Sequence, residues 1–166
     1  RGVNRHEWHP RTGRTLDEQT MRADLELMKR HGVNAIRTSH YPPNARFLDL
    51  CDEYGVWVLL ECDLETHGFE RGGWDGNPTN DDRWYDCLLN RIQRTVERDK
   101  NHPAIIGWSM GNESHCGEGI RLMNDWVKNR DPSRFTHYEG DDAHTICDVW
   151  TVMYPSMEWV EAVRDR

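Results

Sequence analysis

The residues best suited to chemistry follow the most apolar run of this chain. The run Ala104-Ile105-Ile106-Gly107 leads into Trp108-Ser109-Met110-Gly111-Asn112-Glu113-Ser114. An apolar run that ends in an Asn-Glu pair puts a carboxylate where a buried parallel strand leaves the core, and in a (β/α) barrel that end carries the active site. Glu113 is therefore the first candidate for a catalytic acid. Glycoside hydrolysis needs such an acid beside the leaving oxygen, and a second carboxylate across the sugar.

Glu113 also has a purely structural interpretation. Its carboxylate, or the side chain of Asn112, could cap a helix that begins near Gly117, because the helix dipole favours negative charge there. The role of Trp108 also has two interpretations. An aromatic face beside a carboxylate suits sugar stacking, but a tryptophan packed in the core has the same sequence signature.

A second group of reactive side chains follows the apolar run that ends at Leu60. In an extended chain Glu61, Asp63, Glu65 and His67 would lie on one side, because side chains alternate with a period of two. Carboxylates with one imidazole suit Mg²⁺ or Mn²⁺ better than a structural zinc, which prefers thiolates and several histidines. The alternative is a solvated acidic loop without a metal.

Two histidines and one further glutamate also follow predicted strands. His6 and His40 are candidates for the site, although a lone histidine is more often structural. The run His6-Glu7-Trp8-His9 is one residue too short for the zinc-protease motif His-Glu-x-x-His, which excludes that interpretation. Glu139 is a weaker candidate for a catalytic group.

The elements that must position these residues alternate between short β-rich runs and longer amphipathic segments. We expect strands at 2–5, 35–38, 56–60, 104–108, 135–138 and 149–153. We expect helices at 17–31, 44–54, 82–100, 117–130 and 156–166. No repeat or linker interrupts this pattern, so residues 1–166 are expected to form part of a single α/β domain.

Six strands and five helices in this order, counted as about six β/α units, fit either a doubly wound sheet or part of a (β/α)8 barrel. Reactive side chains close nearly every predicted strand, as expected when the loops of a barrel converge on one site. The sequence contains no Gly-rich phosphate loop of the kind that a nucleotide-binding sheet carries. It therefore predicts an incomplete (β/α)8 TIM barrel of about six β/α units, because its 166 residues fall short of the roughly 250 in a full barrel.

Composition argues against several other classes of protein. The formal charge of -8 and the pI near 5.6 argue against a nucleic-acid partner, since nonspecific affinity for nucleic acid comes from Lys and Arg. No apolar run approaches the ~20 residues of a bilayer span, and the first residues lack the apolar region of a signal peptide. Five cysteines without a Cys-x-x-Cys pair predict free thiols in a reducing, cytoplasmic compartment.

Six motifs, taken in order, resemble the central barrel of the family 2 glycoside hydrolases. They span essentially the whole chain: Arg1-Gly2-Val3-Asn4-Arg5-His6-Glu7, Arg37-Thr38-Ser39-His40-Tyr41-Pro42, Leu50-Cys51-Asp52-Glu53-Tyr54-Gly55, Glu65-Thr66-His67-Gly68, Arg98-Asp99-Lys100-Asn101-His102-Pro103 and Gly111-Asn112-Glu113-Ser114. The Glu-Thr-His-Gly motif is similar to the β-galactosidase branch of that family.

The resemblance implies roles for the residues of two of these motifs. Glu113 matches the acid/base of the family, and Asn112 resembles the residue that contacts the sugar 2-hydroxyl. Glu65 and His67 match magnesium ligands of the β-galactosidases, with Glu113 as a third ligand. The implied cofactor is Mg²⁺, with Mn²⁺ as the alternative.

Further residues match the sugar-binding side of the family. His6 and His40 resemble the histidines that hold the galactose hydroxyls, and Tyr154 matches the tyrosine that lies beside the nucleophile. In the family the nucleophile is a glutamate at the end of the seventh strand. Glu139 aligns with the fifth strand instead, so we expect the nucleophile outside this chain.

The implied activity is that of a retaining β-galactosidase that acts on terminal non-reducing β-D-galactosides. The chain itself is expected to be a fragment of the catalytic domain that is inactive alone. Alternatives are another family 2 activity, such as β-glucuronidase or β-mannosidase, or a noncatalytic barrel fragment that binds a sugar or a protein. Unpaired strand edges and an uncovered interior also predict a homo-oligomer.

Overall fold

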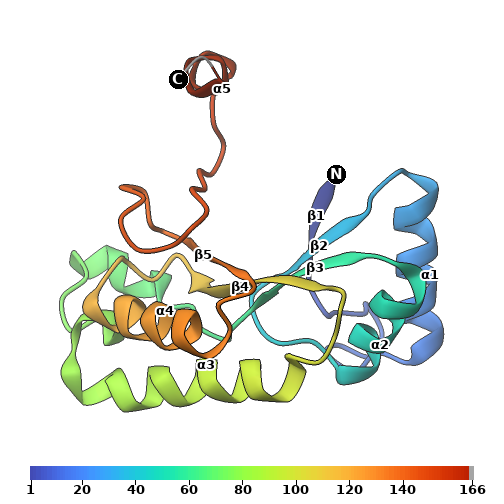
Figure 1. The fold of residues 1–166 in the computed structure, drawn as a ribbon, viewed down its shortest axis with the longest axis horizontal. Coiled ribbons are helices and arrows are strands. Elements are labelled where there is room, and N and C mark those ends of the chain that lie inside the picture. Colours follow the sequence, from blue (N-terminus) through green and yellow to red (C-terminus); the bar gives the residue numbers. More distant parts are fainter. Residues whose placement is uncertain (165–166) are drawn as a thin grey trace.

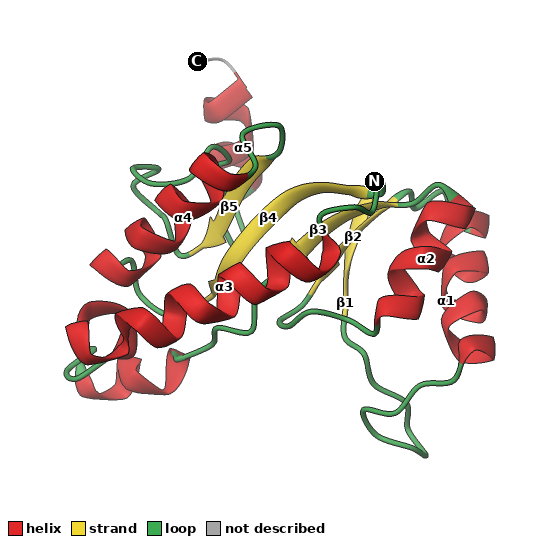
Figure 2. Cartoon of the chain, turned by 60° about the horizontal axis from the view of Figure 1, so that its bottom comes forward, coloured by secondary structure: helices red, strands yellow, loops and turns green. Residues whose placement is uncertain are grey.

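The computed structural model describes residues 1–164 and has one parallel β-sheet with long helices packed on one of its faces (Figures 1 and 2). The strands of this described part are β1 (Gly2–Arg5), β2 (Ala35–Thr38), β3 (Trp57–Glu61), β4 (Ile105–Asn112) and β5 (Phe135–Glu139). They lie side by side in chain order, and each neighbouring pair is parallel. Right-handed crossovers between strands in this order place successive helices on the same face. A doubly wound sheet would instead reverse its strand order at a switch point, so the predicted barrel architecture is confirmed.

The helices lie where the amphipathic segments predicted them: α1 (Glu18–Arg30), α2 (Ala45–Tyr54), α3 (Tyr85–Asp99), α4 (Glu118–Arg130) and α5 (Met157–Arg164). The last two residues of the helix predicted at 156–166 lie outside the described residues. Asp17 caps α1 by accepting a hydrogen bond from the backbone N–H of Thr20 at 2.8 Å. At the end of α2, Gly55 has a φ of 64°, the left-handed conformation that glycine supplies at helix ends. Three short 3-10 helices connect β3 to α3: η1 (His67–Gly72), η2 (Pro78–Asn80) and η3 (Asp82–Trp84).

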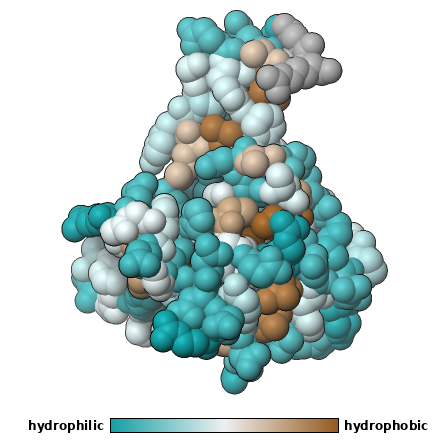
Figure 3. All heavy atoms as spheres, turned by 90° about the vertical axis from the view of Figure 1, so that its left-hand side faces the viewer, coloured by the Kyte–Doolittle hydropathy of each residue, from teal (hydrophilic) through white to brown (hydrophobic). Residues whose placement is uncertain are grey.

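The prediction of a sixth strand at 149–153 is wrong. In the described part of the chain, Val149 makes only an isolated parallel bridge to His137 of β5. The next residue lies outside any strand, and the indole N–H of Trp150 donates to the backbone oxygen of Asp142 at 3.1 Å. Beyond this segment α5 stands apart from the sheet (Figure 1), and the end of the described chain projects from the body of the molecule in the space-filling view (Figure 3).

The hydrophobic core fills the space between the sheet and its helices. It includes fully buried residues from each long helix, among them Leu25, Phe47, Ile92 and Ile120. Trp108 belongs to the same core, since it is fully buried and its indole N–H donates to Asp131 at 2.9 Å. The sugar-stacking interpretation of Trp108 is therefore wrong.

None of the helices within residues 1–164 combines the length and the apolar character that a bilayer span requires.

Candidate active site

The carboxyl ends of β2 to β5 lead into one group of polar side chains, and Glu113 follows β4 directly. The backbone N–H of Glu113 donates to the backbone oxygen of Glu139, the last residue of β5, at 2.8 Å. Glu113 has a φ of 43°, a conformation that is uncommon for a residue with a side chain. Just before it, Gly111 approaches the loop after β3 so closely that a Cβ there would lie 2.7 Å from the backbone oxygen of Leu64. The backbone at the end of β4 is thus shaped to turn one carboxylate out of the sheet.

Ser114 connects this turn to the loop that follows β3. Its hydroxyl accepts a hydrogen bond from the backbone N–H of Thr66 at 2.7 Å and donates to the backbone oxygen of Asn112 at 2.8 Å. Thr66 lies between Glu65 and His67 in the chain. The hydroxyl therefore fixes the separation between these two residues and Glu113.

The three predicted metal ligands come together at this point. One donor atom from each of Glu65, His67 and Glu113 lies within 4.8 Å of the others. Asn112 donates from Nδ2 to Oε2 of Glu65 at 2.7 Å and to Oε2 of Glu113 at 3.1 Å. The capping alternative is wrong, because the N-cap of α4 is Gly117 and has no side-chain capping bond.

The donor set of this trio suits a hard divalent cation. Nε2 of His67 lies 2.8 Å from Oε2 of Glu70, and Nδ1 lies 3.2 Å from Oε2 of Glu113. When Nε2 carries the proton, the Nδ1 lone pair faces a carboxylate oxygen, so a cation or a second proton is needed between them. The hydrogen bond to Glu70 and the negative charges of Glu113 and Glu65 raise the pKa of His67. Two carboxylates and one imidazole leave coordination positions for water, as Mg²⁺ prefers.

The expectation that four residues after Leu60 face one side is wrong for two of them. Glu61 is fully buried beneath the site, whereas Asp63 is exposed and pairs with Arg91 at 3.1 Å. The reason is a tight turn, because the backbone N–H of Leu64 donates to the backbone oxygen of Cys62 at 2.9 Å. Because of that turn, side chains stop alternating between the two sides of the chain after Glu61.

A buried polar network around Glu61 supports the site from below. The carboxylate accepts from Nε of Arg37, Nδ1 of His40 and Oγ of Ser109, each at 2.6 Å. Arg37 also donates from Nη2 to Oδ1 of Asn112 at 2.8 Å. Sequence reasoning missed Arg37 and Ser109. The available signal was a polar side chain within an otherwise apolar, buried strand.

His137 of β5 extends this network. Its Nδ1 lies 2.8 Å from Oγ of Ser109, and its Nε2 lies 3.9 Å from Oε2 of Glu139. Burial, together with the positive charge of Arg37, lowers the pKa of His137 to about 4. The ring is therefore neutral at pH 7. Burial also raises the pKa of Glu139.

The predicted sugar contacts lie around a cavity of about 580 Å³. His40, Asn112, Glu113 and Tyr154 all line it. Tyr154 is 96% exposed, so little of the described chain holds its ring. His6 does not line this cavity but packs edge-on against the ring of His40, with the two centroids 5.2 Å apart.

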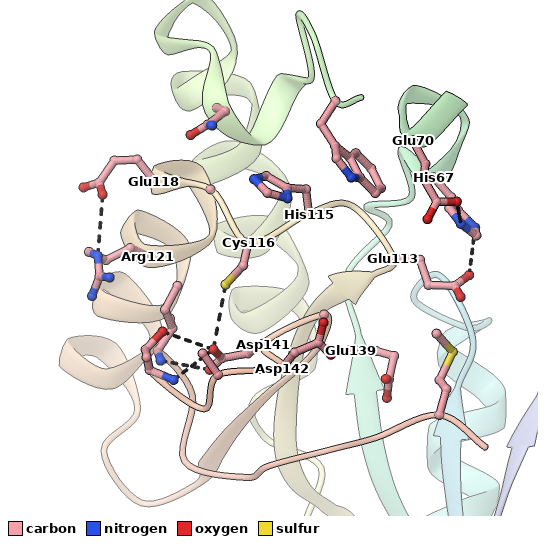
Figure 4. Close-up of a pocket in the computed structure, with 18 of the residues that line it drawn as sticks. His67, Glu70, Glu113, His115, Cys116, Glu118, Arg121, Glu139, Asp141 and Asp142 are labelled. Atoms are coloured by element: carbon pink, nitrogen blue, oxygen red, sulfur yellow. Dashed lines mark hydrogen bonds and ion pairs between the residues drawn. The ribbon is translucent and has the colours of Figure 1, made fainter. Parts of the chain in front are cut away.

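A second cavity of about 830 Å³ opens on the other side of Glu113 (Figure 4). Its wall includes His67, Trp74 and His115, and the ring of Trp74 is nearly parallel to both imidazoles, at 11° and 25°. Sequence reasoning missed Trp74. The available signal was a lone aromatic residue in the glycine-rich stretch from Gly72 to Gly76, which predicts an exposed ring on a loop.

Comparison with known proteins places this geometry in a family. The family described as "Glycosyl hydrolases family 2, TIM barrel domain" matches residues 1–166. The beta-galactosidase of Arthrobacter sp. (strain B7) is 61% identical over 140 residues, which cover 84% of this chain and 14% of that protein. The beta-galactosidase of Vibrio cholerae serotype O1 is 49% identical over 160 residues, which cover 95% of this chain and 15% of that protein. The chain thus spans only about 14 to 15% of the length of these curated relatives.

A solved structure shares the same fold. The apo structure of Bacteroides uniformis beta-glucuronidase 3 matches with a TM-score of 0.73 and 26% sequence identity, over 92% of this chain and 20% of that chain. The parallel sheet, the carboxylate at the end of β4 and the family match over the whole sequence lead to one conclusion. This chain belongs to the TIM barrel domain family of the family 2 glycosyl hydrolases.

Proposed function

We propose that these residues form the acid/base side of a retaining β-galactosidase that hydrolyses terminal non-reducing β-D-galactosides. The observation that carries the proposal is the position of Glu113, whose carboxylate lies with Glu65 and His67 at the edge of a cavity lined by His40 and Asn112. The names of the relatives at 61% and 49% identity support galactose as the sugar.

In the proposed reaction, Glu113 acts first as an acid and then as a base. A carboxylate from outside these residues attacks the anomeric carbon while Glu113 donates its proton to the glycosidic oxygen. Glu113 then takes a proton from water, whose oxygen bonds to the anomeric carbon as the sugar–enzyme bond breaks. Glu139 is less suited to the role of nucleophile, because burial raises its pKa and a nucleophilic carboxylate must be ionised.

The residues that surround Glu113 have separate tasks in this proposal. Hydrogen bonds with Arg37, Glu65 and Glu113 fix the amide of Asn112 at the cavity wall. Glu61 orients the ring of His40. The side chains of Asn112 and His40, with Tyr154 and His6, would hold the sugar hydroxyls. A Mg²⁺ ion bound by Glu65, His67 and Glu113 would supply positive charge beside the acid/base carboxylate.

Removal of the metal tests the proposed cofactor. In the full-length gene product we expect a chelator to lower activity and added Mg²⁺ to restore it. Glu65→Gln should raise the Mg²⁺ concentration needed for half-maximal activity, whereas Glu26→Gln, on the exposed side of α1, should not. Equal metal dependence in the two variants would contradict the assignment of Glu65 as a ligand.

β-Glucuronidase is the competing family 2 activity, because the solved structure described above carries that name. A glucuronide carries a carboxylate that needs a free cation. Arg37 is the arginine that lines the smaller cavity, and it is already neutralised by Glu61 at 2.6 Å. This arrangement favours a neutral sugar.

Hydrolysis of matched aryl glycosides by the full-length gene product decides between these activities. We expect kcat/KM for the β-galactoside to exceed the values for the β-glucuronide and the β-mannoside at least 100-fold. The galactose released first should be the β-anomer. A glucuronide or mannoside that is cleaved as fast as the galactoside would contradict the proposal.

We also propose a cytoplasmic homo-oligomer without a nucleic-acid partner. Burial raises the pKa of the Cys51 and Cys62 thiols to about 12, and all five cysteines are free, which supports a reducing compartment. In the described part of the chain, β1 and β5 each pair with only one neighbouring strand. Apolar side chains, including Leu59 and Ile106, line a hollow of about 370 Å³ beside β1, which supports association with a second surface.

A further inference from the structure

His67 lies between two carboxylates, those of Glu70 and Glu113, as Figure 4 shows. Its Nδ1 lies 3.2 Å from Oε2 of Glu113, and its Nε2 lies 2.8 Å from Oε2 of Glu70. Glu113 belongs with Glu65 and His67 to the proposed metal trio, whereas Glu70 does not. The contact between His67 and Glu70 thus has no part in the function proposed so far.

The contact with Glu70 selects one of two orientations of the imidazole. A half-turn of the ring about its bond to Cβ would exchange Nδ1 with Cδ2 and Nε2 with Cε1. Carbon atoms would then face both carboxylates, and the imidazole would offer neither of them a hydrogen bond. In the observed orientation, a proton on Nε2 is donated to Glu70, and the lone pair of Nδ1 is left free on the side of Glu113.

We infer that Glu70 is a positioning residue for the metal site, because it holds the ring and the proton of His67 in the arrangement that presents Nδ1 to a divalent cation. Metal-bound histidines almost always donate their second N–H to a carboxylate, a backbone carbonyl or water, which fixes the ring and raises the basicity of the ligand. This inference rests on the Mg²⁺ site of the proposed function.

The backbone that carries Glu70 also carries a second restraint on His67. The backbone oxygen of Glu70 accepts from the N–H of Gly73 at 2.9 Å, and the N–H of Trp74 donates to the backbone oxygen of Phe69 at 3.0 Å. Trp74 has a φ of 68°, which is uncommon for a bulky side chain. Its ring is stacked with that of His67, at an angle of 11° and with the centroids 6.3 Å apart. The indole thus lies along one face of the imidazole while Glu70 holds its edge.

An ordinary surface ion pair between Glu70 and His67 would have different consequences. The side chains are 62% and 45% exposed. Exposed pairs contribute little to stability, so Glu70→Ala should leave the unfolding of the metal-free protein nearly unchanged. A positioning role appears instead in metal binding.

The test measures binding of Mn²⁺ to the full-length gene product without substrate, because the electron paramagnetic resonance signal of free Mn²⁺ reports Kd independently of activity. The relevant site is the one that Glu65→Gln weakens. Glu70→Ala should raise Kd at this site roughly 10- to 100-fold, the range typical for loss of a partner of a metal-bound histidine. Glu70→Gln keeps an oxygen that accepts from Nε2–H and should retain most of the affinity. Both variants remove the same charge, so the difference between them isolates the hydrogen bond.

A spectroscopic measurement reports the orientation of the ring. Electron spin echo spectra of bound Mn²⁺ should show modulation from the coordinated nitrogen of His67 in the wild type and in Glu70→Gln. Glu70→Ala should weaken this modulation even at saturating Mn²⁺, because a rotated ring presents carbon to the ion. The matched control is Glu118→Ala, since Glu118 lines the same cavity but lies 3.5 Å from Arg121. This control should change neither Kd nor the modulation.

Equal losses of affinity in Glu70→Ala and Glu70→Gln would overturn the inference, because charge alone would then account for them. A wild-type Kd or undiminished nitrogen modulation in Glu70→Ala would overturn it as well, as would an equal loss in Glu118→Ala. Absence of any Mn²⁺ site that Glu65→Gln weakens would contradict the proposed cofactor itself, and the inference with it.

Discussion

Glu61 is the residue on which the polar contacts beneath the site converge. It is fully buried, and its carboxylate accepts hydrogen bonds from Arg37, His40 and Ser109. A buried charge is tolerated only when its partners satisfy it, and removal of one partner leaves the others without compensation. The side chain therefore has a structural role as well as a role in orienting His40.

Truncation of Glu61 should destabilise the fold strongly. Glu61→Ala leaves the guanidinium of Arg37 without its main partner, so we expect a loss of about 3–5 kcal/mol in the free energy of unfolding. Urea unfolding of the 166-residue chain measures this loss. The exposed Glu26→Ala is the control and should cost less than about 1 kcal/mol. Similar losses in the two variants would contradict the account of the buried network.

Asp131 should make stability depend on pH in the acid range. Burial alone would raise its pKa, but hydrogen bonds from Ser133, Trp108 and Arg134 outweigh burial and lower the pKa to about 2. The folded state thus binds this proton less tightly than the unfolded state. The stabilisation of about 2 kcal/mol is complete above about pH 4 and is lost as the pH falls toward 2.

Comparison with Asp131→Asn isolates that contribution. The free energy of unfolding of the unsubstituted chain should fall more steeply between pH 4 and pH 2 than that of the variant, as followed by urea titrations at each pH. Parallel pH profiles would rule out a depressed pKa at this position.

At the level of elements, helix ends were predictable because their signals are local. Asp17 caps α1 and Gly55 ends α2, as their positions in the sequence indicate. The segment at 149–153 was not predictable in this way, because an apolar run becomes a strand only if a neighbouring strand pairs along it, and such pairing is not local. The loop after β3 shows the same limit. A turn at Leu64 sends Asp63 away from the site, and contacts with residues distant in sequence accompany it: Asp63 pairs with Arg91, and the backbone oxygen of Leu64 accepts from Asn112.

The approach of α4 to the η2 segment should depend on Gly117. A Cβ at this position would lie 2.3 Å from the backbone oxygen of Thr79, and backbone cannot yield as a side chain can. Gly117→Ala should therefore lower the free energy of unfolding by about 1–3 kcal/mol, measured by urea titration. Gly68→Ala serves as the control, because nothing lies within 4 Å of a Cβ there. An equal effect of both substitutions would contradict the close packing of this segment.

At the level of the whole molecule, the barrel architecture was predictable, whereas the placement of each proposed sugar contact was not. Reactive residues at successive strand ends indicated a barrel, and the structure brings Glu65, His67 and Glu113 together as predicted. Tyr154 and His6 are less well placed to contact a sugar. Tyr154 is almost fully exposed, and His6 does not line the smaller cavity. Both follow the outer parts of the described sheet, where few neighbouring elements hold them.

The chain expressed alone should associate with itself and lack hydrolase activity. The free edges of β1 and β5 and the apolar hollow beside β1 expose surface that favours association. Light scattering after size exclusion should give a mass above that of the monomer, and an aryl β-galactoside should not be cleaved. Turnover by the purified chain that Glu113→Gln abolishes would show that the nucleophile lies within it.

Glu113 is proposed to donate the proton to the leaving group, and one measurement tests this role directly. In the full-length gene product, kcat/KM of Glu113→Gln should be compared with that of the unsubstituted enzyme over aryl β-galactosides whose leaving groups differ in pKa. We expect a loss of about 10²- to 10⁴-fold for leaving groups that need protonation, and a much smaller loss for the most acidic phenols. A loss of the same size across the whole series, or no loss at all, would contradict the account.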